Sequence, residues 1–274
     1  MKKPLLLAFA CISMTIVTNA QAPVKPLKKV MELKMPKTED DDMPGTRGAS
    51  VAWHPTQKKY YACFAGNVEY PLAVFDATGK RLSDDELTTM ADTRGIWYNE
   101  TTKLLGGNGY NDFGWFNYKL DNKGMPSDVE VTNEGMHQPD VQSVGAYSSA
   151  TKQVIFVLAS QVYFYNKDAE LQDSIMIHWG HRKADGIDED EDASEQPEDY
   201  NYTTLVYTGI KGQELGFLNI TNKQVELYDV KSGFLTKILS LPETTKTELL
   251  FNFAYANGTY WLFNIEMRKW VGYK

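Results

Sequence analysis

Apolar and polar residues are arranged along this chain in a unit that recurs. Each copy begins with an apolar run of strand length, continues through a tight polar turn that ends in lysine, and returns in a second apolar run. The turns occupy residues 54–58, 99–103 and 148–152, so they begin 45 and then 49 residues apart. The flanking runs are rich in Val, Tyr, Phe and Trp, which favour antiparallel β-strands. The pattern therefore predicts repeated pairs of strands joined by tight turns.

Each unit continues with a third strand that ends in a turn containing Asp or Gly, and some units add a fourth. The predicted third strands are 72–79, 115–124, 162–168 and 224–233, and the predicted fourth strands are 129–132 and 235–241. A fourth unit opens at 202–207, and a fifth begins at residue 249. Four short strands every ~40–50 residues are typical of β-propeller blades. We therefore predict an all-β fold, a β-propeller of five blades, with a sixth only if residues 176–202 form a degenerate one.

A β-sandwich is the alternative architecture for so many short strands. Sandwiches do not repeat one turn pattern at a fixed period, so the propeller is favoured. The fifth unit stops at its third strand, residues 269–274, which leaves a strand edge without a partner. The apolar segment 29–35, which precedes the first unit, could supply the missing outer strand. The sequence thus predicts a ring closed by an N-terminal strand.

Two segments carry a resemblance to known repeat proteins. Residues 74–80 read VFDATGK and residues 227–233 read LYDVKSG, each at the end of a predicted third strand. Over most of residues 29–274 the chain resembles the broad class of YVTN, NHL and WD40-like propellers. The resemblance implies the propeller fold alone. Because the Gly-His and Trp-Asp signature is missing from the sequence, no functional residue is assigned by it.

Residues 1–22 have the layout of a secretory signal peptide. Two lysines precede an apolar run that is too short to span a bilayer, and Ala20 and Ala22 fit a cleavage site. A short packed N-terminal helix is the alternative. A lipid anchor on Cys11 is disfavoured because the apolar region continues well beyond that residue. We expect an exported protein, periplasmic or extracellular, with a single propeller domain at residues 23–274.

The formal net charge of -8 is concentrated in one segment. Residues 185–199 hold nine acidic residues and no basic one, and -8 minus -9 leaves +1 for the rest of the chain. A nearly neutral body argues against the broad basic surface that nucleic-acid binding needs. We predict an acidic loop insert at 183–200 within the propeller domain. Such charge runs are typically solvated.

The acidic insert also has the spacing of a calcium loop. Asp188, Asp190 and Asp192 stand at positions 1, 3 and 5 of an EF-hand-like pattern, which gathers oxygen ligands around one Ca²⁺. However, alanine stands where the sharp turn needs glycine, and the flanks show no helical pattern. Just upstream, His178 and His181 could donate two imidazoles to a transition metal. Calcium binding and a solvated loop remain the two alternatives, and we expect no other cofactor.

The loops that lead into the innermost strands supply the candidate ligand-binding residues. The tripeptide Thr-Arg-Gly occurs twice there and places Arg47 and Arg94 one blade apart. Two guanidinium groups at equivalent positions could hold a carboxylate or a phosphate. Alternatively, they pair with neighbouring aspartates and hold the loops. In the next such loop, His137 and Asp140 form the candidate acid–base pair.

The sequence holds few signs of catalysis. It contains no G-x-S-x-G, no H-E-x-x-H and no Walker loop, and Cys63 lies in an apolar strand, as a buried small hydrophobe would. The aromatic residues Trp97, Tyr110, Trp115 and Tyr147 could stack on sugars, although aromatic side chains in strands are mostly core.

We therefore predict a monomeric, non-catalytic propeller that binds a protein or a small ligand on its loop face. No nucleic acid and no transmembrane segment is expected. The alternative is a propeller lyase or hydrolase whose site lies at the mouth of the central channel, with Arg47, Arg94 and His137 binding and protonating the substrate.

Overall fold

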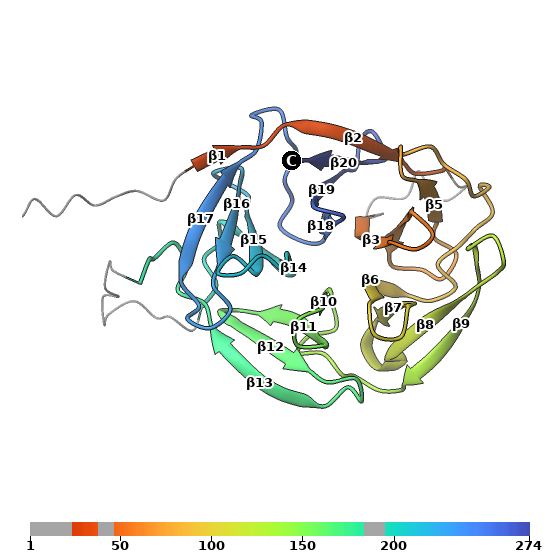
Figure 1. The fold of residues 1–274 in the computed structure, drawn as a ribbon, viewed down its shortest axis with the longest axis horizontal. Helices are drawn as coiled ribbons and strands as arrows, with labels where there is room; N and C mark the ends of the chain where they lie inside the picture. The colour runs from red at the N-terminus through yellow and green to blue at the C-terminus, as the bar shows by residue number, and fades with distance from the viewer. Residues whose placement is uncertain (1–23, 38–46, 184–194) are drawn as a thin grey trace, which may run out of the picture.

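The strands of the chain form five sheets around one central axis (Figure 1). The structure is a computed structural model that describes residues 24–37, 47–183 and 195–274. We number the sheets blades I to V in the chain order of their innermost strands. Each innermost strand begins on one face of the ring, called here the loop face. It ends on the opposite face, called the turn face because tight turns follow there.

The blades contain three to five strands. Blade I contains β3 (Arg47–His54), β4 (Lys59–Ala65) and β5 (Leu72–Asp76). Blade II contains β6 (Thr93–Asn99), β7 (Leu104–Gly109), β8 (Trp115–Leu120) and β9 (Pro126–Asn133). Blade III contains β10 (Ala146–Ser148), β11 (Gln153–Leu158), β12 (Gln161–Tyr165) and β13 (Leu171–Met176).

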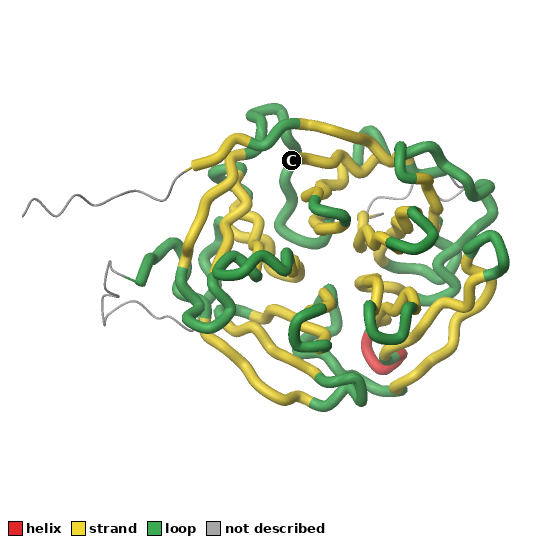
Figure 2. Tube along the Cα trace, in the orientation of Figure 1, coloured by secondary structure: helices red, strands yellow, loops and turns green. Residues whose placement is uncertain are grey.

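The last two blades combine strands from the two ends of the chain. Blade IV contains β14 (Tyr200–Tyr207), β15 (Leu215–Asn219), β16 (Gln224–Tyr228), β17 (Leu235–Ser240) and β1 (Val24–Pro26). Blade V contains β18 (Phe253–Ala256), β19 (Thr259–Asn264), β20 (Lys269–Tyr273) and β2 (Lys29–Lys34). One short 3₁₀ turn, Asn111–Phe113, is the only helical element in the described part of the chain (Figure 2). The prediction of an all-β, five-bladed propeller is confirmed.

The three turns predicted from the repeat share one local structure. Their first side chain accepts a hydrogen bond from the backbone N–H three residues later, in His54, Asn99 and Ser148. Their last residue has a left-handed backbone, at φ 53° in Lys58, 64° in Lys103 and 60° in Lys152. Short polar side chains that cap a backbone N–H favour such turns. The repeated polar pattern is thus a repeated turn geometry.

A second repeated turn joins the third strand of a blade to the segment that follows it. In blades I to IV an Asx side chain accepts hydrogen bonds from two backbone N–H groups of the turn; these are Asp76, Asp121, Asn166 and Asp229. Left-handed residues close these turns, at Gly79, Gly124, Ala169 and Gly233. The Asp-and-Gly signature of the resemblance is therefore explained by turn geometry.

Hydrogen bonds near the loop face join each blade to the next. At the five junctions the donors and acceptors are Ser50 Oγ to Ile96 O (3.1 Å), Asn108 Nδ2 to Ser143 O (2.8 Å), Val144 N to Thr203 O (2.9 Å), Phe251 N to Thr203 Oγ1 (2.8 Å) and Gly48 N to Asn252 Oδ1 (2.7 Å). All of these partners lie on or beside innermost strands. Because a buried polar group is costly unless it is paired, this belt favours close contact between neighbouring blades.

The hydrophobic core lies between the blades. One cluster joins blades V and I and includes Trp261, Trp270 and Phe64, all fully buried. A second cluster joins blades IV and V and includes Leu27, which precedes β2. Since apolar area removed from water stabilises by about 25 cal/mol per Å², these inter-blade contacts are the main source of stability.

The N-terminal segment covers the outer edges of two blades. Strand β2 pairs antiparallel with β20, and β1 pairs parallel with β17. The segment 29–35, for which the sequence predicts an outer-strand position, thus lies on the outside of blade V, as Figure 1 shows. Pairing of β1 was not predicted.

No sixth blade forms within the described parts of residues 176–202. Residues 177–183 run beside blade IV instead, where His178 N donates to Gly233 O (2.9 Å) and Leu235 N donates to His181 O (3.0 Å). Trp179 packs there against Phe217. This segment therefore covers an existing blade, because its apolar residues already have a neighbouring surface to pack on.

Candidate functional site

A cavity lies on the ring axis, between the five innermost strands. It holds about 280 Å³ of space. Its walls are the second halves of β3, β6 and β14, with β10, β18 and residues beside them. The lining extends into the tight turns at Pro55, Glu100 and Asn257. The cavity is therefore associated with the turn face.

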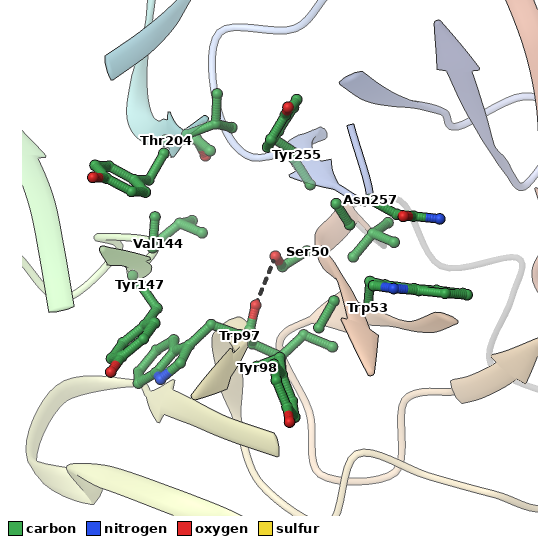
Figure 3. Close-up of a pocket in the computed structure, with 18 of the residues that line it drawn as sticks. Ser50, Trp53, Trp97, Tyr98, Val144, Tyr147, Thr204, Tyr255 and Asn257 are labelled. Atoms are coloured by element: carbon green, nitrogen blue, oxygen red, sulfur yellow. Dashed lines mark hydrogen bonds between the residues drawn. The ribbon is translucent and has the colours of Figure 1, made fainter. Parts of the chain in front are cut away.

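One aromatic side chain from each blade surrounds this cavity close to the turn face. The five residues, called here the aromatic ring, are Trp53, Tyr98, Tyr147, Tyr207 and Tyr255. Each is only partly buried and lies at or next to the end of its innermost strand. In Figure 3 the side chains of Trp53, Tyr98, Tyr147 and Tyr255 are distributed around the axis, and their rings point outward from Ser50 at the centre. Partly exposed aromatic rings beside a cavity can contact a ligand face to face.

Neighbouring side chains hold the aromatic ring in place. Trp53 packs on Tyr60 with ring centroids 4.4 Å apart, and Tyr255 packs on Tyr260 at 4.9 Å. Tyr98 lies 4.6 Å from His54 of the preceding blade. The Tyr147 hydroxyl is 3.2 Å from Thr101 Oγ1. Side chains that are ordered before binding lose less conformational entropy when a ligand arrives.

The lining of the cavity is almost free of charge. Glu100 is the one lining residue with a formal charge, and it is exposed. Burial raises the pKa of the Tyr255 hydroxyl above its usual value, which keeps this phenol neutral at physiological pH. Deeper in the cavity, Ser50 Oγ donates a hydrogen bond to Ile96 O (3.1 Å, dashed in Figure 3). Thr204 adds a second hydroxyl to the lining. The site therefore offers aromatic surface and hydroxyl groups.

The loop-face end of the axis is filled by side chains. Phe251 is 5% exposed and belongs to one cluster with Ala49, Ile96 and Val144, which come from three other blades. Its backbone carbonyl accepts a hydrogen bond from Asn201 Nδ2 (2.9 Å). A large side chain with contacts to residues of three other blades lies close to the axis. Among the described residues, Phe251 therefore packs at the loop-face end of the axis.

The two predicted arginines lie near this closed end, outside the cavity lining. Arg94 is 5% exposed and donates from Nη1 to Asp92 Oδ1, and its guanidinium lies 4.4 Å from the ring centroid of Tyr110. Arg47 is half-buried at the start of β3, and its backbone is paired with Ala65. Arg94 thus contacts residues of its own blade, and its guanidinium also lies 5.9 Å from the ring centroid of Phe251 in blade V. Anion binding by Arg47 and Arg94 together stays a prediction.

The predicted acid–base pair lies in the loop before β10. His137 Nε2 is 2.9 Å from the carbonyl of Glu134, and Asp140 Oδ1 accepts a hydrogen bond from the backbone N–H of Gln142 (2.8 Å). Among the described residues no hydrogen bond joins His137 to Asp140. Each side chain instead organises its own part of the loop, and neither lines the axial cavity.

The predicted calcium ligands Asp188, Asp190 and Asp192 lie outside the described residues. Upstream of them, the His178 ring stacks on Phe234 with centroids 4.2 Å apart, and burial lowers the pKa of this imidazole. Within residues 24–37, 47–183 and 195–274, no group of three or more His, Cys, Asp or Glu side chains is placed to hold a metal ion.

The sequence pattern did not predict that these five aromatic residues lie together around one cavity. Of the four aromatics considered for sugar stacking, Tyr147 belongs to it, and Trp97 lines the same cavity although it is only 7% exposed. A signal was present, since three ring members, Trp53, Tyr98 and Tyr147, immediately precede the three repeated turns. Comparing equivalent positions between repeats would have found them.

Comparisons with known proteins show the fold of this chain and assign it to no family. Neither a protein-family model nor a curated protein matches the sequence. The glutaminyl cyclase of Myxococcus xanthus is similar in structure, with a TM-score of 0.57 and 8% identity over 93% of this chain and 98% of that one. A gluconolactonase of Xanthomonas campestris gives a TM-score of 0.49 and 11% identity over 93% and 99% of the two chains. No described residue belongs to a helix long and apolar enough to cross a membrane. At 8% identity, the structural similarity to the glutaminyl cyclase shows that the two proteins share the five-bladed β-propeller fold.

Proposed function

We propose that this protein binds a small, uncharged, ring-shaped ligand in the axial cavity, through the turn face. The observation that carries the proposal is the aromatic ring, one partly exposed aromatic side chain per blade around a nearly uncharged cavity. Flat aromatic faces bind flat or apolar ligand faces, and an uncharged lining does not compensate the desolvation of an ionic ligand. Aromatic faces and an uncharged lining are sufficient for binding without catalysis.

The cavity lining gives less support to the enzyme alternative. General acid–base catalysis usually needs two ionisable groups that converge on the reacting bond. Around the axial cavity the lining supplies one carboxylate, that of Glu100, together with tyrosine hydroxyls. Similarity of fold to an enzyme does not transfer activity, because one propeller scaffold can carry unrelated sites.

The proposal is tested with ligands that share a ring and differ in charge. One set is methyl glucoside, glucuronate and glucosamine; the other is benzyl alcohol, benzoate and benzylamine. Calorimetry and thermal shift should show that a neutral member of at least one set binds at about millimolar concentration or tighter. Tyr207→Ala and Tyr255→Ala should each weaken that binding about tenfold. Tyr163→Ala, outside the cavity lining, is the matched control.

Three results would contradict the proposal. Binding of the anionic members alone would favour the arginines near the loop face, Arg47 and Arg94. Conversion of the bound compound, detected by mass spectrometry, would support a propeller enzyme. Absence of binding by every neutral compound at about 10 mM would exclude the class of ligand proposed here.

We further propose that the protein acts outside the cytoplasm, in the periplasm or the medium. The support is the signal-like layout of residues 1–22. N-terminal sequencing of the protein recovered from cell fractions should begin at Gln21 or Pro23. An intact N-terminus in the cytoplasmic fraction would refute export.

A further inference from the structure

A second cavity lies beside the axial one, between blades II and III. It holds about 330 Å³ of space and shares two lining residues with the axial cavity, Trp97 and Tyr147. We call it the inter-blade cleft. Its other lining residues include Trp115, Asn117 and Lys152. The two cavities therefore lie on either side of Trp97 and Tyr147, so a ligand longer than one ring would reach both by passing over these side chains.

Two glycines, which have no side chain, leave space for the Trp97 indole. A Cβ atom at Gly106 on β7 would lie 2.9 Å from Trp97 Nε1, and one at Gly145 before β10 would lie 2.7 Å from the Trp97 ring. These approaches are shorter than van der Waals contact allows. The small residues thus let a large aromatic side chain occupy the wall between the two cavities.

The cleft contains a buried donor without a partner. Trp115 is 4% exposed, lines the cleft, and its Nε1–H makes no hydrogen bond within the described chain. Its ring lies edge-on to Trp97, with centroids 6.0 Å apart. A buried N–H without an acceptor is costly, and an explanation is needed wherever one occurs. An acceptor oxygen on a bound molecule would satisfy it.

The polar side chains of the cleft are mainly amides and hydroxyls. Four asparagines line it, and the half-buried amide of Asn117 makes no hydrogen bond within the described residues. An amide offers both donors and acceptors, which suits a ligand whose hydroxyl groups do the same. Lys167 Nζ lies 2.6 Å from Asp168 Oδ1, so these two charges largely compensate each other. Lys152 is the remaining charged lining residue.

From this combination we propose that the inter-blade cleft is the second subsite of a neutral oligosaccharide, whose first sugar ring occupies the axial cavity. This inference rests on the proposed function and names its ligand class. A sugar ring presents an apolar C–H face for the indole and phenol rings and a rim of hydroxyls for the amides. A small movement of the Trp115 indole on binding lets its unpartnered N–H donate to a hydroxyl or ring oxygen of the second sugar.

The test compares ligand length. Cellohexaose, xylohexaose, maltohexaose and chitohexaose are titrated against their monosaccharides, with indole fluorescence and calorimetry as readouts. At least one hexasaccharide should bind about tenfold or more tightly than its monosaccharide. Hexagalacturonate and a Gly-Ala hexapeptide test the charged and peptide classes. Tighter binding of either would overturn the assignment.

Variants of the cleft separate this inference from the proposed function. Asn117→Ala and the exposed Lys152→Ala should weaken hexasaccharide binding and leave monosaccharide binding within about twofold. Tyr255→Ala should weaken both. Asn122→Ala, an exposed asparagine of blade II outside both linings, is the matched control. Its thermal midpoint and that of Asn117→Ala show that the fold is retained.

Each outcome has a separate meaning. If small neutral rings bind but longer chains bind no better, or if Asn117→Ala and Lys152→Ala both behave as Asn122→Ala does, the cleft is not a subsite and the axial function stands. If neither monosaccharides nor hexasaccharides change the fluorescence or release heat at about 10 mM, the oligosaccharide assignment is wrong.

Discussion

His54 combines a structural and a titratable role at the start of the first tight turn. Its ring is 6% exposed, and Nδ1 accepts the backbone N–H of Gln57 (3.4 Å). Burial is the largest cause that lowers the pKa of this imidazole below its usual value. Protonation is therefore harder in the folded protein than in the unfolded chain. The stability that His54 contributes is fully present above the unfolded pKa of about 6.5 and is lost as the pH falls from there through the lower pKa of the folded state.

The equivalent turn residue in blade II suggests a substitution that removes this titration. Asn99 takes the same position and accepts from the backbone N–H of Thr102 (3.2 Å). We expect His54→Asn to reduce the loss of stability between pH 7.5 and pH 5.5, because the acceptor is kept and the titrating ring is gone. Urea midpoints at the two pH values measure this. A pH dependence equal to that of the native chain, or one that His137→Asn reduces just as much, would contradict the assignment.

At the scale of single elements, the N-terminal segment shows how one side chain can connect two blades. Leu27 is 5% exposed, and its backbone N–H donates to Ser240 O (2.8 Å) at the end of β17. The next residue, Lys28, exchanges backbone hydrogen bonds with Lys274 beyond β20. Leu27 thus fills the junction where the segment passes from blade IV to blade V.

Truncation of Leu27 should therefore cost stability, while truncation beside it should not. We expect Leu27→Ala to lower the free energy of unfolding by about 2–4 kcal/mol, as for other buried leucines. Val30→Ala lies on β2, where the side chain is 51% exposed, and should change it by less than ~0.5 kcal/mol. Denaturant unfolding of both variants measures the difference. Equal effects would show that the segment contributes through strand pairing alone.

Strands could be predicted from the apolar pattern of the sequence where the side chains on both faces of the blade are buried. Strand β4 is apolar and buried from Tyr60 to Ala65 because neighbouring blades cover both of its faces, and it begins directly after the predicted turn 54–58. Strand β13 has five exposed residues of six, and β1 is fully exposed, so neither carries an apolar pattern. Their existence depends on backbone pairing with β12 and β17. Pairing of this kind leaves no mark in the side-chain pattern.

At the scale of the whole molecule, the number of blades was predictable and the open end of the axis was not. The blade count follows from the spacing of the turns, which is local information. The open end depends on Phe251 meeting Ala49, Ile96 and Val144, residues that lie far apart in sequence. Arg94 is turned toward Asp92 and Tyr110 by the same packing. The candidate residues were therefore drawn from the loop face, whereas the cavity lining extends to the turns.

The face through which a ligand enters can be determined by blocking each face in turn. In a chain with Cys11→Ser, a cysteine is introduced either by Glu100→Cys beside the cavity or by His137→Cys on the loop face, and it is labelled with a bulky maleimide. The native Cys63 does not interfere, because its thiol is buried and burial raises its pKa to about 12.

Labelling at position 100 should abolish binding of the neutral compound that binds best, because the label covers the aromatic ring. Labelling at position 137 should leave its affinity within about twofold, since Phe251 and the hydrogen-bonded belt separate that loop from the cavity. The unlabelled Glu100→Cys and His137→Cys proteins control for the substitutions themselves. The opposite pattern would place the site on the loop face. In that case Arg47, Arg94, His137 and Asp140 would become the residues to test next.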